Sequence, residues 1–238
     1  MIIPQNDRIR LEQIQKFYDT IYYHRTPAYS SISHHYHRLA ARIGICQGDK
    51  ILDVACGVGA WLLTCKHHGA IPYGIDLSHK AIATCKEVMP EHEFYVQPAE
   101  ELPFRNRQFD IVSCLGALEH FIDPQRALKE MVRVAKDDAT ILLLVPNAQF
   151  LAYHLRLFSG TNQAEEQEKV LPLDQWQAMF IENGLEIQKK WRDLHLLSWR
   201  WLSLRGWKAI PIRIMQAFII AVLPLRWQYQ VYYQCYKK

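Results

Sequence analysis

The chain has 238 residues, of which 50% are hydrophobic and 22% charged, and its formal net charge at pH 7 is +4. This composition supplies enough apolar surface for a large core and excludes a disordered or collagen-like chain. The longest apolar stretch near the C-terminus, Ile214 to Leu225, is shorter than the roughly 20 residues that span a membrane. We therefore expect a cytoplasmic protein without a transmembrane helix or a secretory signal.

The six cysteines are widely spaced and include no C-x-x-C pair, so we expect neither a disulfide framework nor a zinc site. Charge is unevenly distributed, because residues 190–238 contain nine Lys and Arg residues but only one acidic residue, Asp193. A basic region of this kind suits contact with phosphates, anionic lipids or an anionic substrate.

A helical segment is expected over about residues 9–43, and short β-rich runs then alternate with helical patterns. The strand candidates are Lys50–Val54, Pro72–Asp76, Glu93–Gln97, Ile111–Leu115 and Thr140–Val145. Alternation of this kind predicts parallel strands joined by crossover helices. The fifth run is apolar on both faces, as a central strand covered by helices should be.

The second half of the chain begins with a polar connector, followed by a helix with Trp176 and Phe180 on one face. Asn183-Gly184 ends this helix, and a strand is expected over Leu185–Leu194. A seventh strand, expected to pair with the sixth at the edge of the sheet, is predicted at the end of the chain. There Tyr229, Val231, Tyr233 and Cys235 alternate with Gln228, Gln230, Tyr232 and Gln234.

The sharpest motif is a buried strand that runs into Gly57-Val58-Gly59 and then into a helical pattern. Glycines at a strand-to-helix turn let the backbone approach a ligand closely. Asp76 follows Gly59 by seventeen residues and ends the next strand, where its carboxylate can accept hydrogen bonds from both hydroxyls of a ribose. Together these features predict a crevice that binds a nucleoside.

Two residues distinguish between nucleosides. The dinucleotide fingerprint G-x-G-x-x-G/A requires glycine or alanine where this chain has Leu62. Asp53, just ahead of the glycines, would repel a pyrophosphate but attract a cationic ammonium group. We therefore expect a cationic ligand, and an NAD-dependent oxidoreductase becomes the weakest of our hypotheses.

Five segments in this order resemble the class I S-adenosylmethionine-dependent methyltransferases (the type 11 methyltransferase domain), in the branch similar to the ubiquinone/menaquinone-biosynthesis methyltransferases. The segments are Leu52–Gly57, Gly74–Ser78, Ala99–Phe104, Phe109–Ser113 and Leu118–Pro124. The resemblance implies an α/β fold with a Rossmann-like seven-stranded sheet, mostly parallel with the last strand antiparallel, and helices on both faces. A helical cap is expected before the last strand, at about residues 195–226.

The same resemblance divides the single domain into three parts. Residues 1–45 would form an N-terminal helical lid and residues 46–150 the cofactor-binding core. Residues 151–238 would form the substrate-side half. Tyr18, Tyr22 and Tyr23 belong to the expected lid, and core packing is an equally open role for them.

The resemblance also implies which residues bind S-adenosylmethionine. The methionine part, the ribose, the adenine and the surroundings of the sulfonium would be contacted by Asp53, Ala55, Cys56, Gly57, Gly59, Asp76, Leu77, Ala99, Glu100, Leu115 and Gly116. Pro98 stands where many members have an aspartate that contacts the adenine amino group, so this contact is missing or comes from Glu100. Val58 stands where threonine is frequent.

The acceptor is constrained mainly by exclusion. The Asn/Asp-Pro-Pro-Tyr/Phe box of nucleic-acid amino methyltransferases is replaced by Leu115-Gly116-Ala117-Leu118, so we expect no nucleic-acid substrate. His120 follows this segment, and its intrinsic pKa suits a general base, although it could equally only order the loop. We expect transfer to oxygen or carbon of a small-molecule or lipid-linked acceptor.

Two sequence features leave alternatives open. The histidines at 34, 35 and 37 have no carboxylate or cysteine at ligand spacing, so we expect no metal site. Five of the seven tryptophans lie at residues 191–227 among arginines, which suits a peripheral membrane contact, a pocket for a large substrate, or helices packed on the sheet. A catalytically inactive subunit that binds the cofactor and holds a partner is the alternative function.

Overall fold

The computed structural model describes residues 4–23, 34–151, 169–194, 210, 214 and 222–238. A seven-stranded sheet in the order β3-β2-β1-β4-β5-β7-β6 forms its centre. The strands are β1 Lys50–Val54, β2 Ile71–Asp76, β3 Glu93–Val96, β4 Phe109–Leu115, β5 Ala135–Pro146, β6 Leu185–Arg192 and β7 Gln230–Lys237. Strands β1 to β5 pair in parallel, whereas β7 lies antiparallel between β5 and β6. The predicted fold class, including the antiparallel last strand, is confirmed.

The described helical elements are α1 Gln5–Phe17, η1 Tyr18–Tyr22, α3 His34–Ile43, α4 Ala60–His67, α5 His79–Val88, η2 Leu118–His120, α6 Pro124–Val134, α8 Leu173–Glu182 and η5 Leu225–Trp227. Two helices begin at side-chain caps, because Ser78 accepts a hydrogen bond from the N–H of Ala81 and Asp123 accepts one from Arg126. The helical segment expected over residues 9–43 begins four residues earlier, and its described parts are α1, η1 and α3.

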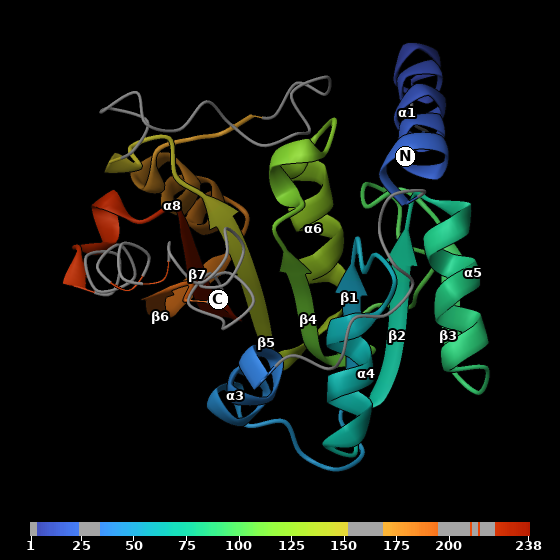
Figure 1. Ribbon diagram of the computed structural model, residues 1–238, viewed down its shortest axis with the longest axis horizontal. Helices are drawn as coiled ribbons and strands as arrows, with labels where there is room; N and C mark the ends of the chain where they lie inside the picture. Colours follow the sequence, from blue (N-terminus) through green and yellow to red (C-terminus); the bar gives the residue numbers. More distant parts are fainter. Residues whose placement is uncertain (1–3, 24–33, 152–168, 195–209, 211–213, 215–221) are drawn as a thin grey trace.

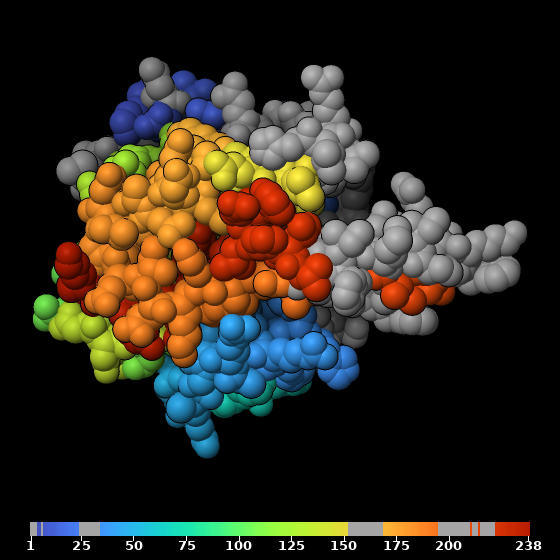
Figure 2. Space-filling model, turned by 90° about the vertical axis from the view of Figure 1, so that its left-hand side faces the viewer, coloured from blue at the N-terminus to red at the C-terminus, as the bar shows by residue number. Residues whose placement is uncertain are grey.

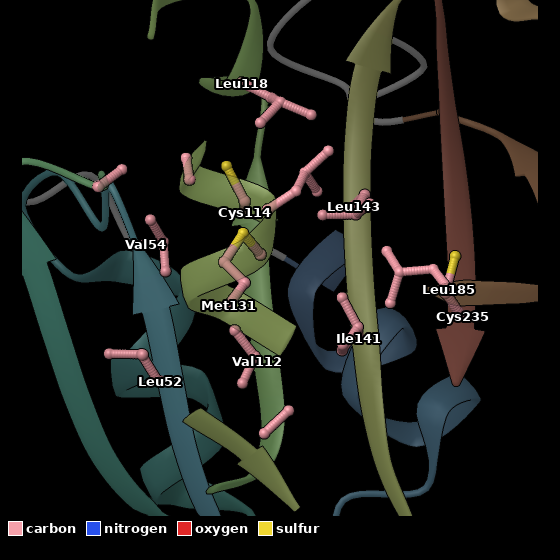
Figure 3. Close-up of a cluster of buried hydrophobic side chains, with 14 of the residues drawn as sticks. Leu52, Val54, Val112, Cys114, Leu118, Met131, Ile141, Leu143, Leu185 and Cys235 are labelled. Atoms are coloured by element: carbon pink, nitrogen blue, oxygen red, sulfur yellow. The ribbon is translucent and has the colours of Figure 1, made fainter. Parts of the chain in front are cut away.

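The sheet has a separate apolar core on each face. On one face, Leu39 of α3, Trp61 of α4 and Ile82 of α5 belong to a cluster with buried residues of β1, β4 and β5. On the other face, Met131 of α6 and Phe180 of α8 cluster with the side chains of alternate sheet residues. Figure 3 shows Met131 among the side chains that β1, β4 and β5 direct to this face. Both faces are covered, as a mostly parallel sheet requires.

The carboxyl ends of the parallel strands meet at one edge of the sheet. In Figure 1 the arrowheads of β1, β2, β4 and β5 point toward the end of the molecule at which α1 lies. From β1 the chain proceeds to β2 on one side, and it later returns to place β4 on the other side. Ligands of open α/β sheets bind at such a reversal of strand order, so this edge is the expected place for a site.

The sheet extends farther than the apolar runs indicate. β5 begins at Ala135, five residues before the predicted start, and its pairing with β4 shifts register between Phe109 and Ile111. The added residues of β5 include Lys136, Asp137 and Asp138, whose polarity hid the strand from the hydrophobic pattern. The cap expected at residues 195–226 lies largely outside the described residues. Among the helices that the structure describes, none has the length and apolar character needed to cross a bilayer.

Candidate functional site

A cavity of about 330 Å³ lies at the carboxyl ends of β1, β2 and β4. Its size falls within the range of typical ligand pockets. Most of the predicted site residues line it, namely Asp53, Ala55, Cys56, Gly57, Asp76, Leu77, Ala99, Glu100, Leu115, Gly116 and His120. Tyrosines of η1 and α3 close the wall on the N-terminal side, together with Leu11 and Ile14 of α1.

Gly59 is the one predicted cofactor residue that does not line the cavity. It precedes α4 with φ +80°, and a Cβ at this position would lie 2.9 Å from Cys85 Sγ and 3.1 Å from Met89 Cε. The absence of a side chain therefore lets α5 pack against the back of the loop. Gly57 is the glycine on the cavity side, where an added Cβ would lie 3.1 Å from the hydroxyl of Tyr23.

The glycine loop is also held by close packing between α4 and β2, where a large residue of the helix meets a glycine of the strand. Leu62 of α4 is fully buried, and Gly74 of β2 lies beneath it. A Cβ on Gly74 would lie 3.0 Å from Leu62 Cδ1 and 2.8 Å from Cys56 Sγ. In dinucleotide-binding folds, a small residue in the helix lets helix and strand approach closely. In this chain, a glycine in the strand has that role.

Asp76 is a buried carboxylate held by the backbone. Its Oδ2 accepts a hydrogen bond from the N–H of Gly57 at 2.9 Å, and its Oδ1 accepts one from the N–H of Ser78 at 2.8 Å. Burial raises its pKa to about 6, although these two hydrogen bonds act in the opposite direction. A carboxylate has about four acceptor positions, so acceptor capacity remains beyond these backbone contacts for the hydroxyls of a ligand.

Asp53 is held by a chain of side-chain donors. The indole N–H of Trp61 donates to Ser113 Oγ at 3.1 Å, and the Ser113 hydroxyl donates to Asp53 Oδ1 at 2.6 Å. Only 3% of Asp53 is exposed, and burial raises its pKa to about 7 despite the hydrogen bond from Ser113. A cationic group in the cavity would relieve the cost of ionising this carboxylate.

Glu100 has a structural contact of its own at the cavity wall. Its Oε1 accepts a hydrogen bond from the N–H of Asp123 at 3.1 Å, which holds the start of α6. Burial raises the pKa of Glu100. Gln97, which sequence reasoning did not single out, lines the same part of the cavity beside Pro98 and Ala99. Nothing in its own sequence context marked Gln97, because only the turn after β3 brings it to the wall.

His120 lies on the cavity wall at the end of η2. Its Nε2 is 4.0 Å from Oε1 of Glu119, whose side chain is 6% exposed. The imidazole therefore lies on the cavity wall with a buried carboxylate next to it, within reach of a group bound in the cavity.

The charged cavity residues are of one sign. Asp53, Asp76 and Glu100 are its carboxylates, and among the described residues that line it there is no lysine or arginine. A ligand with a positive centre and a ribose fits this donor set, whereas a polyphosphate would meet carboxylates without a compensating cation. The residues thus fit the nucleoside sulfonium cofactor expected from the sequence.

The histidines of α3 make contacts outside the cavity. His35 Nε2 is 2.9 Å from the hydroxyl of Tyr232, and His37 Nδ1 is 3.1 Å from Nε2 of His68. In the described part of the chain, no group of three or more metal-ligating side chains is placed to hold an ion. All six cysteines are free thiols.

Comparison with known protein sequences points to one enzyme class. The profile of a family described as a methyltransferase domain matches residues 52–143. Over 111 residues the chain is 32% identical to a ubiquinone biosynthesis O-methyltransferase of Coxiella burnetii. The aligned residues are 45% of this chain and 47% of that protein. The chain thus spans about half the length of this curated relative.

Solved structures of the same fold extend over more of the chain. The YcgJ protein of Bacillus subtilis matches with a TM-score of 0.60 at 22% identity, over 87% of this chain and 99% of that one. Magnesium protoporphyrin IX methyltransferase of Synechocystis PCC 6803, solved with bound SAH, matches with a TM-score of 0.64 at 15% identity, over 95% and 99% of the two chains. At these identities the likeness establishes the fold.

Proposed function

We propose that the protein is a class I methyltransferase that binds S-adenosylmethionine and transfers its methyl group to a small-molecule acceptor, and the methyltransferase-domain profile that matches residues 52–143 supports this. The observation that carries this proposal is the pair of buried carboxylates, Asp53 and Asp76, on either side of Gly57 in one cavity.

Each part of the cofactor has a partner in this cavity. The free acceptor positions of Asp76 suit the two ribose hydroxyls, and Asp53 suits the ammonium of the methionine part. Ala99 and Glu100 are proposed to frame the adenine, and Leu115 with Gly116 to lie beside the sulfonium. When bound, the cofactor supplies a methyl group on a positively charged sulfur. The apolar and aromatic wall excludes water from that centre.

The acceptor is proposed to be methylated at oxygen or carbon, and to be a small or lipid-linked molecule rather than a nucleic acid. The Coxiella relative is named as an O-methyltransferase, which supports oxygen. His120 is proposed to accept the proton of the nucleophile, because it reaches the cavity and is backed by the buried Glu119. Positioning of the acceptor within about 3 Å of the methyl group supplies most of the remaining rate.

Calorimetric titration of the full chain with S-adenosylmethionine, S-adenosylhomocysteine and NAD tests the cofactor. We expect micromolar binding of the first two and none of NAD. The Asp76→Ala variant should lose about 1–3 kcal/mol of binding free energy, because the ribose hydroxyls are left without their acceptor. Binding of NAD alone, or unchanged affinity of the variant, would contradict the assignment.

Transfer of a labelled methyl group into small-molecule and lipid extracts then tests activity. With an acceptor identified in this way, His120→Ala should lower kcat by about a hundredfold while leaving the affinity for S-adenosylhomocysteine unchanged. If His120 only orders the loop, cofactor affinity and kcat will fall together, and His120→Asn will restore both.

A further inference from the structure

Two phenol groups of the cavity wall, Tyr23 and Tyr36, have hydroxyls for which the described residues provide no hydrogen bond. Tyr23 lies over Gly57, and burial followed by the charge of Asp76 raises its pKa. Tyr36 packs against Trp61 with ring centroids 5.7 Å apart, and burial followed by the charge of Asp53 raises its pKa. Both phenols therefore keep their protons at any physiological pH and are available as donors.

The two phenols serve different ends of the cavity. Tyr23 lies over Gly57, whose N–H donates to Asp76, the residue proposed for the ribose. Tyr36 packs on Trp61, which is joined through Ser113 to Asp53, the residue proposed for the ammonium. In the methionine part of the cofactor, the ammonium and the carboxylate are attached to the same carbon. A donor for the carboxylate must therefore lie close to Asp53.

Two other donors near this point are already engaged. The indole N–H of Trp61 donates to Ser113, and the N–H of Gly57 donates to Asp76. Because no lysine or arginine is among the described cavity residues, a carboxylate here would meet no cationic side chain from them. Neutral donors are what the described wall offers, and Tyr36 is one that packs on Trp61, the start of the chain of hydrogen bonds to Asp53.

We propose that Tyr36 donates a hydrogen bond to the carboxylate of the methionine part of S-adenosylmethionine. This inference rests on the proposed function and assigns a binding residue to it. Tyr36 comes from α3, far in sequence from the glycine loop, and the motif that predicted the site does not extend to it.

The helix that carries Tyr36 is anchored independently of the cavity. On α3, His35 contacts the hydroxyl of Tyr232 at 2.9 Å, and the guanidinium of Arg42 lies 4.2 Å from the ring centroid of Trp191. In Figure 2 the light-blue surface that includes α3 lies next to the orange surface of β6, where Arg42 meets Trp191. The phenol is thus held in place before a ligand arrives, which lowers the entropic cost of binding.

Calorimetry with two ligands isolates the contact, because 5′-methylthioadenosine shares the adenosine of S-adenosylhomocysteine but lacks its amino-acid part. Tyr36→Phe should lower the affinity for S-adenosylhomocysteine by about tenfold or more. It should change the affinity for methylthioadenosine by less than about twofold. Tyr23→Phe, which also removes one phenol hydroxyl from the wall, should affect both ligands alike.

The outcomes separate this inference from the proposed function. If Tyr36→Phe weakens both ligands equally, or neither, the carboxylate contact is wrong and the cofactor assignment stands. If the wild-type protein binds neither ligand, the proposed function fails and this inference fails with it. Circular dichroism and thermal unfolding of both variants exclude loss of fold as the cause.

Discussion

At the scale of single residues, the site is built from carboxylates that the fold makes costly to ionise. Asp53 and Asp76 are buried, and burial raises their pKa values to about 7 and about 6. By contrast, burial of Asp110 is outweighed by hydrogen bonds from Lys136 and from the N–H of Lys50, so its pKa is lowered. The raised pair is retained at the expense of stability, which is typical of ligand-binding groups.

Asp53→Asn should therefore stabilise the ligand-free protein, increasingly so as the pH rises. The folded-state pKa of Asp53 lies above its unfolded value, so its contribution to stability is complete below about pH 4 and lost as the pH rises through about 7. Asparagine does not ionise and avoids this loss. In thermal unfolding, the Tm of the variant should exceed that of the wild-type protein by about 3 °C or more at pH 8, and by less at pH 5.

Asp110→Asn is the matched control for this experiment. Its lowered pKa means that the carboxylate contributes stability above its unfolded pKa, so the variant should lower Tm at pH 8. If both variants shift Tm in the same direction, the difference between the two carboxylates is not electrostatic.

Asp53→Asn should also lower the affinity for S-adenosylhomocysteine, because the ammonium loses its counter-charge.

At the scale of elements, the glycine loop is fixed by the packing of its helix on two neighbouring strands. α4 follows β1 directly, and its buried Leu62 fits into the space left by Gly74 of β2. The other side of the loop rests on α5 through Cys85, next to Gly59. The position of the loop backbone is thus decided by contacts among three elements rather than by the loop residues alone.

A double-mutant cycle tests this packing. Gly74→Ala should destabilise the protein by about 1–3 kcal/mol, because the added methyl group overlaps Leu62, Cys56 and Phe94. Leu62→Ala alone should cost about 2–5 kcal/mol through the cavity it leaves. In the double variant the two changes compensate in part, so urea unfolding should give less than the sum. Strictly additive losses would mean that the two residues are not in steric contact.

At the scale of the whole molecule, charge separates the cavity from the C-terminal part of the chain. The cavity carboxylates attract cations, whereas the basic residues at 190–238 attract anions. We propose that this basic stretch gives the protein a reversible contact with anionic membranes, which would bring it to a lipid-linked acceptor. Most of the tryptophans and arginines on which this proposal rests lie outside the described residues, so its support is the sequence.

Co-sedimentation with vesicles that contain anionic lipid measures this contact. Binding should be present at low salt and fall steeply as salt is raised, because the attraction is screened. Replacing Arg200 and Arg205 by glutamine should weaken binding to the vesicles. The same replacement of the exposed Lys86 and Lys129 should leave binding unchanged. Equal losses in the two variants would point to net charge alone, and no binding at low salt would remove the proposal.

The elements and the loop of the site could be predicted because their signals are local. Apolar periodicity located the strands, and the glycines with Asp76 marked a nucleoside crevice, since the carboxyl ends of parallel strands necessarily meet at one edge. Strand ends were less certain where charged residues extend the ladder, as at the start of β5.

Tertiary structure alone decided which side chains complete the wall. That Gly59 faces α5, that Gly74 makes room for Leu62, and that Tyr36 lines the same cavity as Asp53 all depend on how elements distant in sequence pack together. No periodicity or spacing within one segment records such contacts, because they are set by the mutual fit of surfaces from different parts of the chain. The sequence by itself determined where the strands lie along the chain and which residues form the glycine loop. Tertiary packing determined which side chains face that loop.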